Sequence, residues 1–158
     1  MEDIKHYLSR YLVMKQAARR IRSELEEADK IDIERIEILR GSLILPSSAS
    51  DGMPRTRNSK DRITEIEAQI DEIQREINAR HKGLLQQLEA IRRFLEQIED
   101  EIRSMDDETS KAVLRARYIE GLTWYDISRM LQYSEFYCKK ELHIKALEEF
   151  SEKKRRKK

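Results

Sequence analysis

Residues Gly121 to Phe150 read GLTWYDISRMLQYSEFYCKKELHIKALEEF, and two helices begin within this stretch. Thr123 precedes the first helical pattern, and Ser134 precedes the second and longer one. Hydroxyl side chains at such positions accept hydrogen bonds from the unpaired N–H groups of a first helical turn. A third helix is predicted just upstream, from Ser110 to Ile119. The sequence therefore predicts a three-helix unit with tight connections.

Several residues of this stretch resemble the region-four helix-turn-helix of bacterial sigma factors at matching spacings: Gly121-Leu122-Thr123, Ile127, Leu131, Ser134 and Ala146-Leu147. The resemblance covers roughly the last third of the chain. It implies that the helix after Ser134 lies in the major groove of double-stranded DNA. Two departures stand out. Gln132 occupies a turn where the family usually has glycine, and the last helix is one residue longer before Ala146-Leu147.

The organisation of the whole chain, a long helical N-terminal region followed by this module, resembles that of phage transcriptional regulators of the ArpU and RinA type. This second resemblance implies a sequence-specific, DNA-binding regulator of phage or prophage genes, with RNA polymerase as a possible further partner. We therefore expect residues 106–152 to form the helix-turn-helix module. Residues 153–158 are expected to form a flexible basic tail.

The composition favours an all-α protein with a thin core, because 39% of the residues are hydrophobic and 40% are charged. Only four glycines and two prolines occur, which disfavours a sheet with many turns. The formal net charge is +1, yet six cations lie at the C-terminal end, so the preceding residues are net acidic. This balance argues against a uniformly basic DNA-binding surface.

Residues 1–105 are predicted to form a long antiparallel, coiled-coil-like hairpin. The first helix, Asp3 to about Leu39, carries a three-four apolar alternation: Ile4, Tyr7, Tyr11, Met14, Ala18, Ile21, Leu25 and Ala28. Packing within the chain is the favoured interpretation, and pairing between copies of the chain is the alternative. Because Gly41 and a Ser/Pro/Gly-rich segment follow, we expect a mobile linker over about 42–59.

The second helix, from about Ser59 to Met105, has an apolar residue at every seventh position: Ile63, Ile70, Ile77, Leu84, Ile91, Ile98 and Met105. Its companion positions drift around the helix through polar Arg80 and Gln87, as expected near 3.6 residues per turn. We expect its first half to pack on the Ile4 to Ala28 stripe. Its second half is expected to meet the C-terminal module or another copy of the chain. Stripes this long also predict a homo-oligomer.

In the C-terminal module, the predicted core is Trp124, Ile127, Leu131, Cys138, Leu142 and Ala146. With Cys138 facing inward, a step of about 100° per residue turns Phe136, Lys140 and His143 outward, flanked by Glu135, Tyr137 and Lys139. These six side chains are the candidate DNA-reading residues. Four tail residues, Lys153, Lys154, Arg155 and Arg156, are added as candidate phosphate contacts.

The sequence offers no recognisable catalytic, cofactor or metal site. His6, His81 and His143 are far apart, and no phosphate-binding glycine loop or nucleophile motif occurs. Cys138 is the only cysteine, which excludes an intrachain disulfide and fits a reducing cytoplasm. No run approaches the about 20 apolar residues that span a bilayer. We therefore expect a cytoplasmic non-enzyme without cofactors and without a membrane partner.

Two other functions remain open. The first is a coiled-coil assembly or adaptor protein whose terminal module binds protein, and the acidic balance before the tail favours it. The second is a DNA-packaging protein similar to the small subunit of a phage terminase. Such subunits usually carry the DNA-binding module first, whereas here it comes last.

Overall fold

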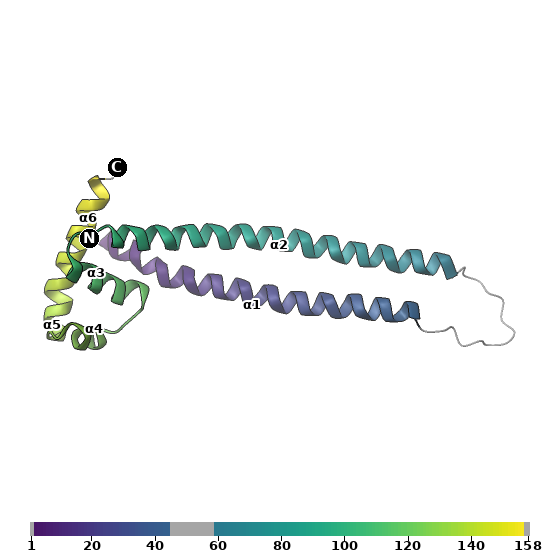
Figure 1. Cartoon of the computed structure of the whole chain (residues 1–158), viewed down its shortest axis with the longest axis horizontal. Helices are drawn as coiled ribbons and strands as arrows, with labels where there is room; N and C mark the ends of the chain where they lie inside the picture. The colour runs from purple at the N-terminus through teal and green to yellow at the C-terminus, as the bar shows by residue number, and fades with distance from the viewer. Residues whose placement is uncertain (1, 45–58, 157–158) are drawn as a thin grey trace. The chain divides into compact units, whose positions relative to one another are not determined.

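The computed structural model describes residues 2–44 and 59–156, and all its regular elements are helical. Two long helices come first, α1 (Glu2–Ile44) and α2 (Ser59–Arg103) (Figure 1). Six shorter segments follow: α3 (Glu108–Leu114), η1 (Arg115–Ile119), α4 (Trp124–Leu131), α5 (Glu135–Tyr137), η2 (Cys138–Leu142) and α6 (His143–Arg156). The segments η1 and η2 are π-helical turns. The all-α prediction is therefore confirmed.

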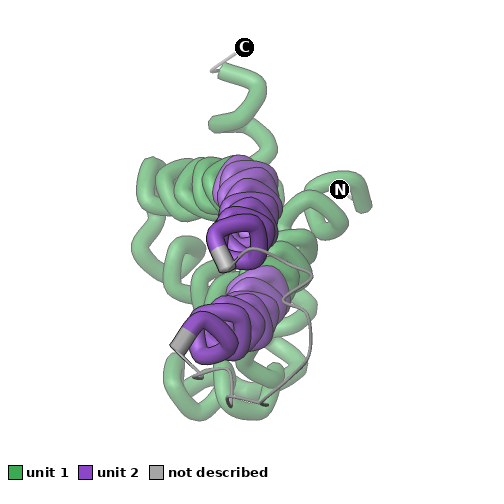
Figure 2. Tube along the Cα trace, turned by 90° about the vertical axis from the view of Figure 1, so that its right-hand side faces the viewer, with its two compact units in different colours: residues 1–19, 88–158 green, residues 20–87 purple. Residues whose placement is uncertain are grey.

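The chain divides into two compact units, coloured separately in Figure 2. Unit 1 comprises residues 1–19 and 88–158, and unit 2 comprises residues 20–87. The sequence-based division placed its boundary near residue 105 instead. The two divisions differ because the first turns of α1 and the last turns of α2 share a core with the C-terminal helices.

The main core of unit 1 joins both long helices to the C-terminal module. Its largest fully buried members come from α1 (Leu8), α2 (Ile98), α3 (Leu114) and α6 (Leu147, Phe150). The second half of α2 thus meets the C-terminal module, as predicted. Leu8 is buried although it does not belong to the predicted stripe. Both α2 and the module cover α1 here, and together they bury a face of α1 that is wider than one heptad seam.

A second core in unit 1 lies within the helix-turn-helix module. Val113, Ala116, Ile127, Cys138 and Leu142 are buried there. Half-buried partners pack against them: Leu122, Trp124 and Leu131. The six predicted core residues therefore all lie in or against a core, with Ala146 in the neighbouring cluster.

The two long helices pack antiparallel, and contacts in each unit fix which residues meet. In unit 1 the Tyr11 hydroxyl donates to Glu99, and in unit 2 Arg80 donates to Asp32 at 2.7 Å. The predicted pairing of the first half of α2 with the Ile4 to Ala28 stripe is wrong. In a hairpin the residues nearest the connection must meet, so Ile73 of α2 lies with Ile38 and Leu39 of α1 around a cavity of about 470 Å³.

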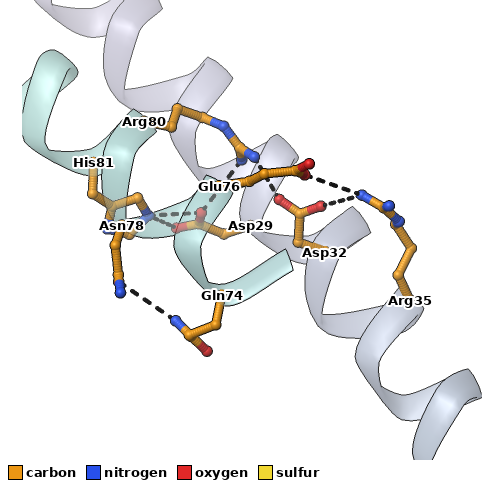
Figure 3. A network of polar contacts seen from close by, with 8 residues as sticks. All are labelled: Asp29, Asp32, Arg35, Gln74, Glu76, Asn78, Arg80 and His81. Atoms are coloured by element: carbon orange, nitrogen blue, oxygen red, sulfur yellow. Dashed lines mark hydrogen bonds and ion pairs between the residues drawn. The ribbon is translucent and has the colours of Figure 1, made fainter. Parts of the chain in front are cut away.

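Polar side chains interrupt the apolar seam of unit 2. Asp32 is 4% exposed and accepts hydrogen bonds from Arg80 and from Arg35, the latter at 3.1 Å. One turn earlier, Asp29 lies 2.8 Å from Nε2 of His81 (Figure 3). The Arg80 hydrogen bond is the main cause that holds the pKa of Asp32 below its usual value.

The long helices extend further toward their connection than predicted. Helix α1 continues through Gly41 to Ile44, and α2 begins at Ser59. The predicted linker therefore loses three residues to α1 and one to α2, and its remainder, 45–58, lies outside the described residues. Gly83 lies inside continuous α2, with open space where a Cβ would stand.

Candidate nucleic-acid interface

The two predicted helix starts of the module carry the expected caps. The Thr123 hydroxyl accepts from the Asp126 N–H at 3.2 Å, and the Asp126 carboxylate reaches back to the Thr123 N–H. The Ser134 hydroxyl accepts from the Tyr137 N–H at 3.2 Å. Caps of this kind set the residue at which each helix begins. Both starts are therefore confirmed.

The turn between the two helices requires a left-handed residue. Gln132, at φ 60° and ψ 35°, ends α4 in the conformation that glycine usually supplies. Its N–H and that of Tyr133 both donate to the Ser128 carbonyl, which closes the end of α4. This chain thus makes the tight turn with glutamine, at a backbone cost of about 1 to 2 kcal/mol.

From Ser134 onward, α5, η2 and α6 form one continuous helical segment. The extra residue seen in the sequence before Ala146-Leu147 is accommodated by η2, because a π-helical turn closes with hydrogen bonds to the fifth residue instead of the fourth. Cys138 anchors the inner face of this segment, because its side chain is fully buried. The burial raises the pKa of the Cys138 thiol. The inward direction of Cys138 is as predicted.

Five of the six predicted reading residues lie exposed on the first turns of this segment: Glu135, Phe136, Tyr137, Lys139 and Lys140. Phe136 is 71% exposed, which is unusual for so large an apolar side chain. The Tyr137 ring packs against Tyr133 with centroids 5.2 Å apart. The salt bridges of the described part of this segment use Lys145, Lys153 and Lys154, and neither Lys139 nor Lys140.

His143 is the exception, because it is only 7% exposed and does not face outward. Its Nε2 lies 2.9 Å from the Tyr118 hydroxyl, and its ring packs 4.8 Å from Trp124. In an α-helix the fifth residue after Cys138 would lie about 140° away around the axis. The π-helical turn returns it toward the buried face instead. Burial, with Lys5 and Arg117 nearby, lowers the pKa of His143 to about 4.

The predicted flexible tail is helical as far as Arg156, and two of its lysines are engaged within unit 1. Lys153 donates to the Ser104 carbonyl and to Asp106, the latter at 2.8 Å. Lys154 lies 3.1 Å from Glu101 and 3.2 Å from the Tyr7 ring centroid. Arg155 and Arg156 are exposed, and residues 157–158 lie outside the described residues. Asp106, just after α2, and Glu101, in its last turn, therefore neutralise the first two cations of the tail.

Sequence reasoning missed two cations beside the reading residues. Lys5 comes from α1 and Arg117 from η1, and both lie next to Lys139 and Lys140 around one pocket. Arg117 donates to the Leu122 carbonyl at 2.9 Å and lies 5.0 Å from the Trp124 ring. No motif joins residues so far apart in sequence, so only the fold brings them together.

No family model, curated protein or solved structure matches this chain. Within residues 2–44 and 59–156, no helix has the length and apolar character needed to cross a membrane. The same residues hold no group of three or more His, Cys, Asp or Glu side chains that would suit a metal ion.

Proposed function

We propose that this protein is a sequence-specific, DNA-binding transcriptional regulator, of phage or prophage genes, that acts without enzymatic chemistry. The observation that carries the proposal is the capped helix after Ser134, which is anchored by Cys138 and leaves its first turns free. A reading helix needs this combination, because its outward N-terminal side chains must reach base edges while its inner face is held rigidly.

The exposed side chains have suitable chemistry for a major groove. Lys139 and Lys140 can donate to guanine acceptors or to phosphate, and Tyr137 and Phe136 can meet a thymine methyl group. Glu135 can accept from cytosine. His143 is removed from this set by its burial. Of the tail residues, Arg155 and Arg156 remain as candidate phosphate contacts. We further propose RNA polymerase as a possible protein partner and a homo-oligomer as the functional form.

The test is a salt titration of binding to native upstream DNA and to random-sequence DNA. A DNA-binding regulator loses affinity steeply as salt rises, because counterions are no longer released into a dilute solution. Tyr137→Ala should cost about 1 to 3 kcal/mol on the preferred site and little on random DNA. Glu148→Ala, a change at an exposed position further along α6, serves as the matched control.

A second candidate function is an adaptor that binds protein through the module. The exposed aromatic side chains around α4 and α5 favour it, since Tyr125 is 59%, Tyr133 51% and Phe136 71% exposed. Aromatic residues are enriched at protein interfaces, where they anchor a partner. An adaptor would bind neither DNA in the titration. If both DNAs bind equally and Tyr137→Ala changes nothing, the helix after Ser134 is not the reader.

A further inference from the structure

A pocket of about 480 Å³ lies within unit 1, beside the candidate reading helix. Its walls come from the first turns of α1, from η1 and the turn after it, from the start of α4, and from the helical segment after Ser134. Eleven residues line it: Lys5, Ser9, Leu12, Arg117, Tyr118, Gly121, Trp124, Lys139, Lys140, His143 and Ile144. Four of them are cationic and none is acidic. This is a net charge of +4 around one cavity, in a chain whose net charge is only +1.

The pocket's cations differ from most others in unit 1, which are neutralised by carboxylates. Lys145 pairs with Asp107 at 2.7 Å, Lys153 with Asp106 and Lys154 with Glu101. Among the pocket's cations within the described residues, only Lys5 has a salt bridge, a 3.8 Å contact with Glu2, whose side chain is 91% exposed. Such an exposed contact is worth little. No carboxylate among the lining residues therefore offsets the positive charge of the pocket.

Neutral groups of the pocket wall hold Arg117 in place. The Arg117 guanidinium lies over the Trp124 ring and donates one hydrogen bond to the Leu122 carbonyl, which leaves further N–H groups to bind a ligand. His143 and Tyr118, hydrogen-bonded to each other, are buried behind it. Burial, with the nearby cations Lys5 and Arg117, lowers the pKa of His143 to about 4, so the histidine stays neutral there at pH 7.

We propose that this pocket binds a phosphate group, held by Arg117 and by the ammonium groups of Lys5, Lys139 and Lys140. Guanidinium and ammonium groups that converge without a carboxylate suit a phosphate, because charge-assisted hydrogen bonds satisfy its several oxygens. The cavity lies within the size range of small-ligand pockets, so the phosphate belongs to a larger molecule.

Two sources carry this chemistry: the backbone of a bound DNA duplex and a free nucleotide. The first source rests on the proposed function, and the second does not. In the first case α1 takes part in DNA binding through Lys5, which lies outside the helix-turn-helix module. The phosphate contact would then fix the orientation of the reading helix without adding sequence preference.

The experiment uses Trp124, the chain's only tryptophan, as a fluorescent reporter inside the pocket. The full-length protein is titrated separately with inorganic phosphate, with AMP and with a random-sequence duplex, against sodium chloride at matched ionic strength. We expect a saturable change for AMP or for the duplex. Lys5→Gln, which keeps Trp124 and its direct contacts, should weaken that binding at least about tenfold, equivalent to 1.4 kcal/mol. Lys30→Gln, an exposed change on the same helix in unit 2, should leave it unchanged.

The outcomes separate the two proposals. Saturation by AMP that depends on Lys5, without any DNA binding, supports the phosphate site and removes the proposed function. Saturation by the duplex alone, with a salt dependence that is shallower in Lys5→Gln, supports a backbone contact. The phosphate site is overturned if no probe saturates, or if Lys5→Gln and Lys140→Gln leave all affinities unchanged. DNA binding that depends on Tyr137 and ignores Lys5 would keep the regulator and discard the pocket.

Discussion

At the scale of single residues, Gly121 occupies a position that other residues fill poorly. Its φ is +75°, a left-handed conformation, and a Cβ added there would lie 3.3 Å from Cδ1 of Leu12. Glycine adopts this backbone without the steric penalty that a Cβ imposes. The residue therefore allows the turn after η1 to approach α1 closely, at the edge of the phosphate pocket.

Gly121→Ala is expected to lower the free energy of unfolding by about 1 to 3 kcal/mol, from backbone strain and the close contact with Leu12. Gly83→Ala is the matched control, because Gly83 lies inside α2 with open space around its Cβ position. That change should raise stability by about 0.5 to 1 kcal/mol through helix propensity. Urea denaturation measures both. Equal effects of the two substitutions would contradict the role assigned to Gly121.

His143 predicts a loss of stability in acid. The unfolded chain protonates this residue near pH 6.5, whereas burial delays protonation of the folded chain to about pH 4. The contribution of neutral His143 is therefore complete above pH 6.5 and is lost as the pH falls toward 4. The expected loss is about 2 to 3 kcal/mol.

Thermal or urea unfolding between pH 7 and pH 4 measures this loss. His143→Gln, which can hydrogen-bond but does not titrate, should flatten the dependence over that window even if it lowers stability at pH 7. The carboxylates with lowered pKa values, such as Asp106 and Asp107, act below this window. An unchanged slope in the variant would show that His143 is not the group responsible.

At the scale of the elements, the antiparallel pairing of α1 and α2 in unit 2 depends on a polar layer as well as on an apolar seam. Asp32 and Arg80 stand where an uninterrupted heptad pattern would place apolar residues. Nη1 of Arg80 is buried without a hydrogen-bond partner in the described residues, 4.0 Å from Asp29. Buried polar groups of this kind penalise shifted pairings, because a shift would leave the carboxylate alone in the seam.

Asp32→Ala should destabilise unit 2 by about 1 to 3 kcal/mol, since it removes the carboxylate to which Arg80 donates its hydrogen bond. The expected destabilisation is smaller than that for breaking a fully buried ion pair, because the Arg80 side chain is 30% exposed. Hydrogen exchange of the amides in residues 20–44 and 59–87 of the full chain measures the effect locally. The double change Asp32→Leu with Arg80→Leu should restore protection. If the double variant exchanges faster than the single one, the pair contributes net stability beyond its role in pairing.

At the scale of the whole molecule, the apolar side chains that the chain leaves uncovered predict self-association. In unit 2, Ile31 and Ile38 are 55% and 72% exposed and stand seven residues apart on one face of α1. Ile38 also lines the cavity of about 470 Å³ between the long helices. A second copy of the chain offers the same stripe, as a two-fold symmetric interface requires.

Sedimentation at tens of micromolar is expected to show a dimer. At this protein concentration even weak interfaces, with Kd values of roughly 1 to 10 μM, are occupied. Ile38→Glu should shift the equilibrium toward monomer, while Arg40→Gln, an exposed change on the opposite side of the same helix, should not. A monomeric unaltered protein under these conditions would remove the oligomer from the proposal, without deciding whether the module binds DNA.

The sequence by itself determined the features that depend on near neighbours along the chain. Helix starts at Thr123 and Ser134, the inward side of Cys138 and the all-α class follow from local hydrogen bonding and from apolar periodicity, and these predictions are confirmed. Even the extra residue before Ala146-Leu147 was visible in the sequence. What it did not reveal was that a π-helical turn absorbs that residue and carries His143 into the core.

Only the tertiary structure decided which distant residues meet. The pairing of α1 with α2 depends on how the connection closes, so Ile73 meets Ile38 and Leu39 instead of the Ile4 to Ala28 stripe. The engagement of Lys153 and Lys154 depends on the last turn of α2 and the residues just after it lying beside α6. The pocket of Lys5, Arg117, Lys139 and Lys140 gathers cations from three separate segments. Periodicity describes one helix at a time, whereas packing between elements sets burial and local charge, and hence the sites at which this chain can bind a ligand.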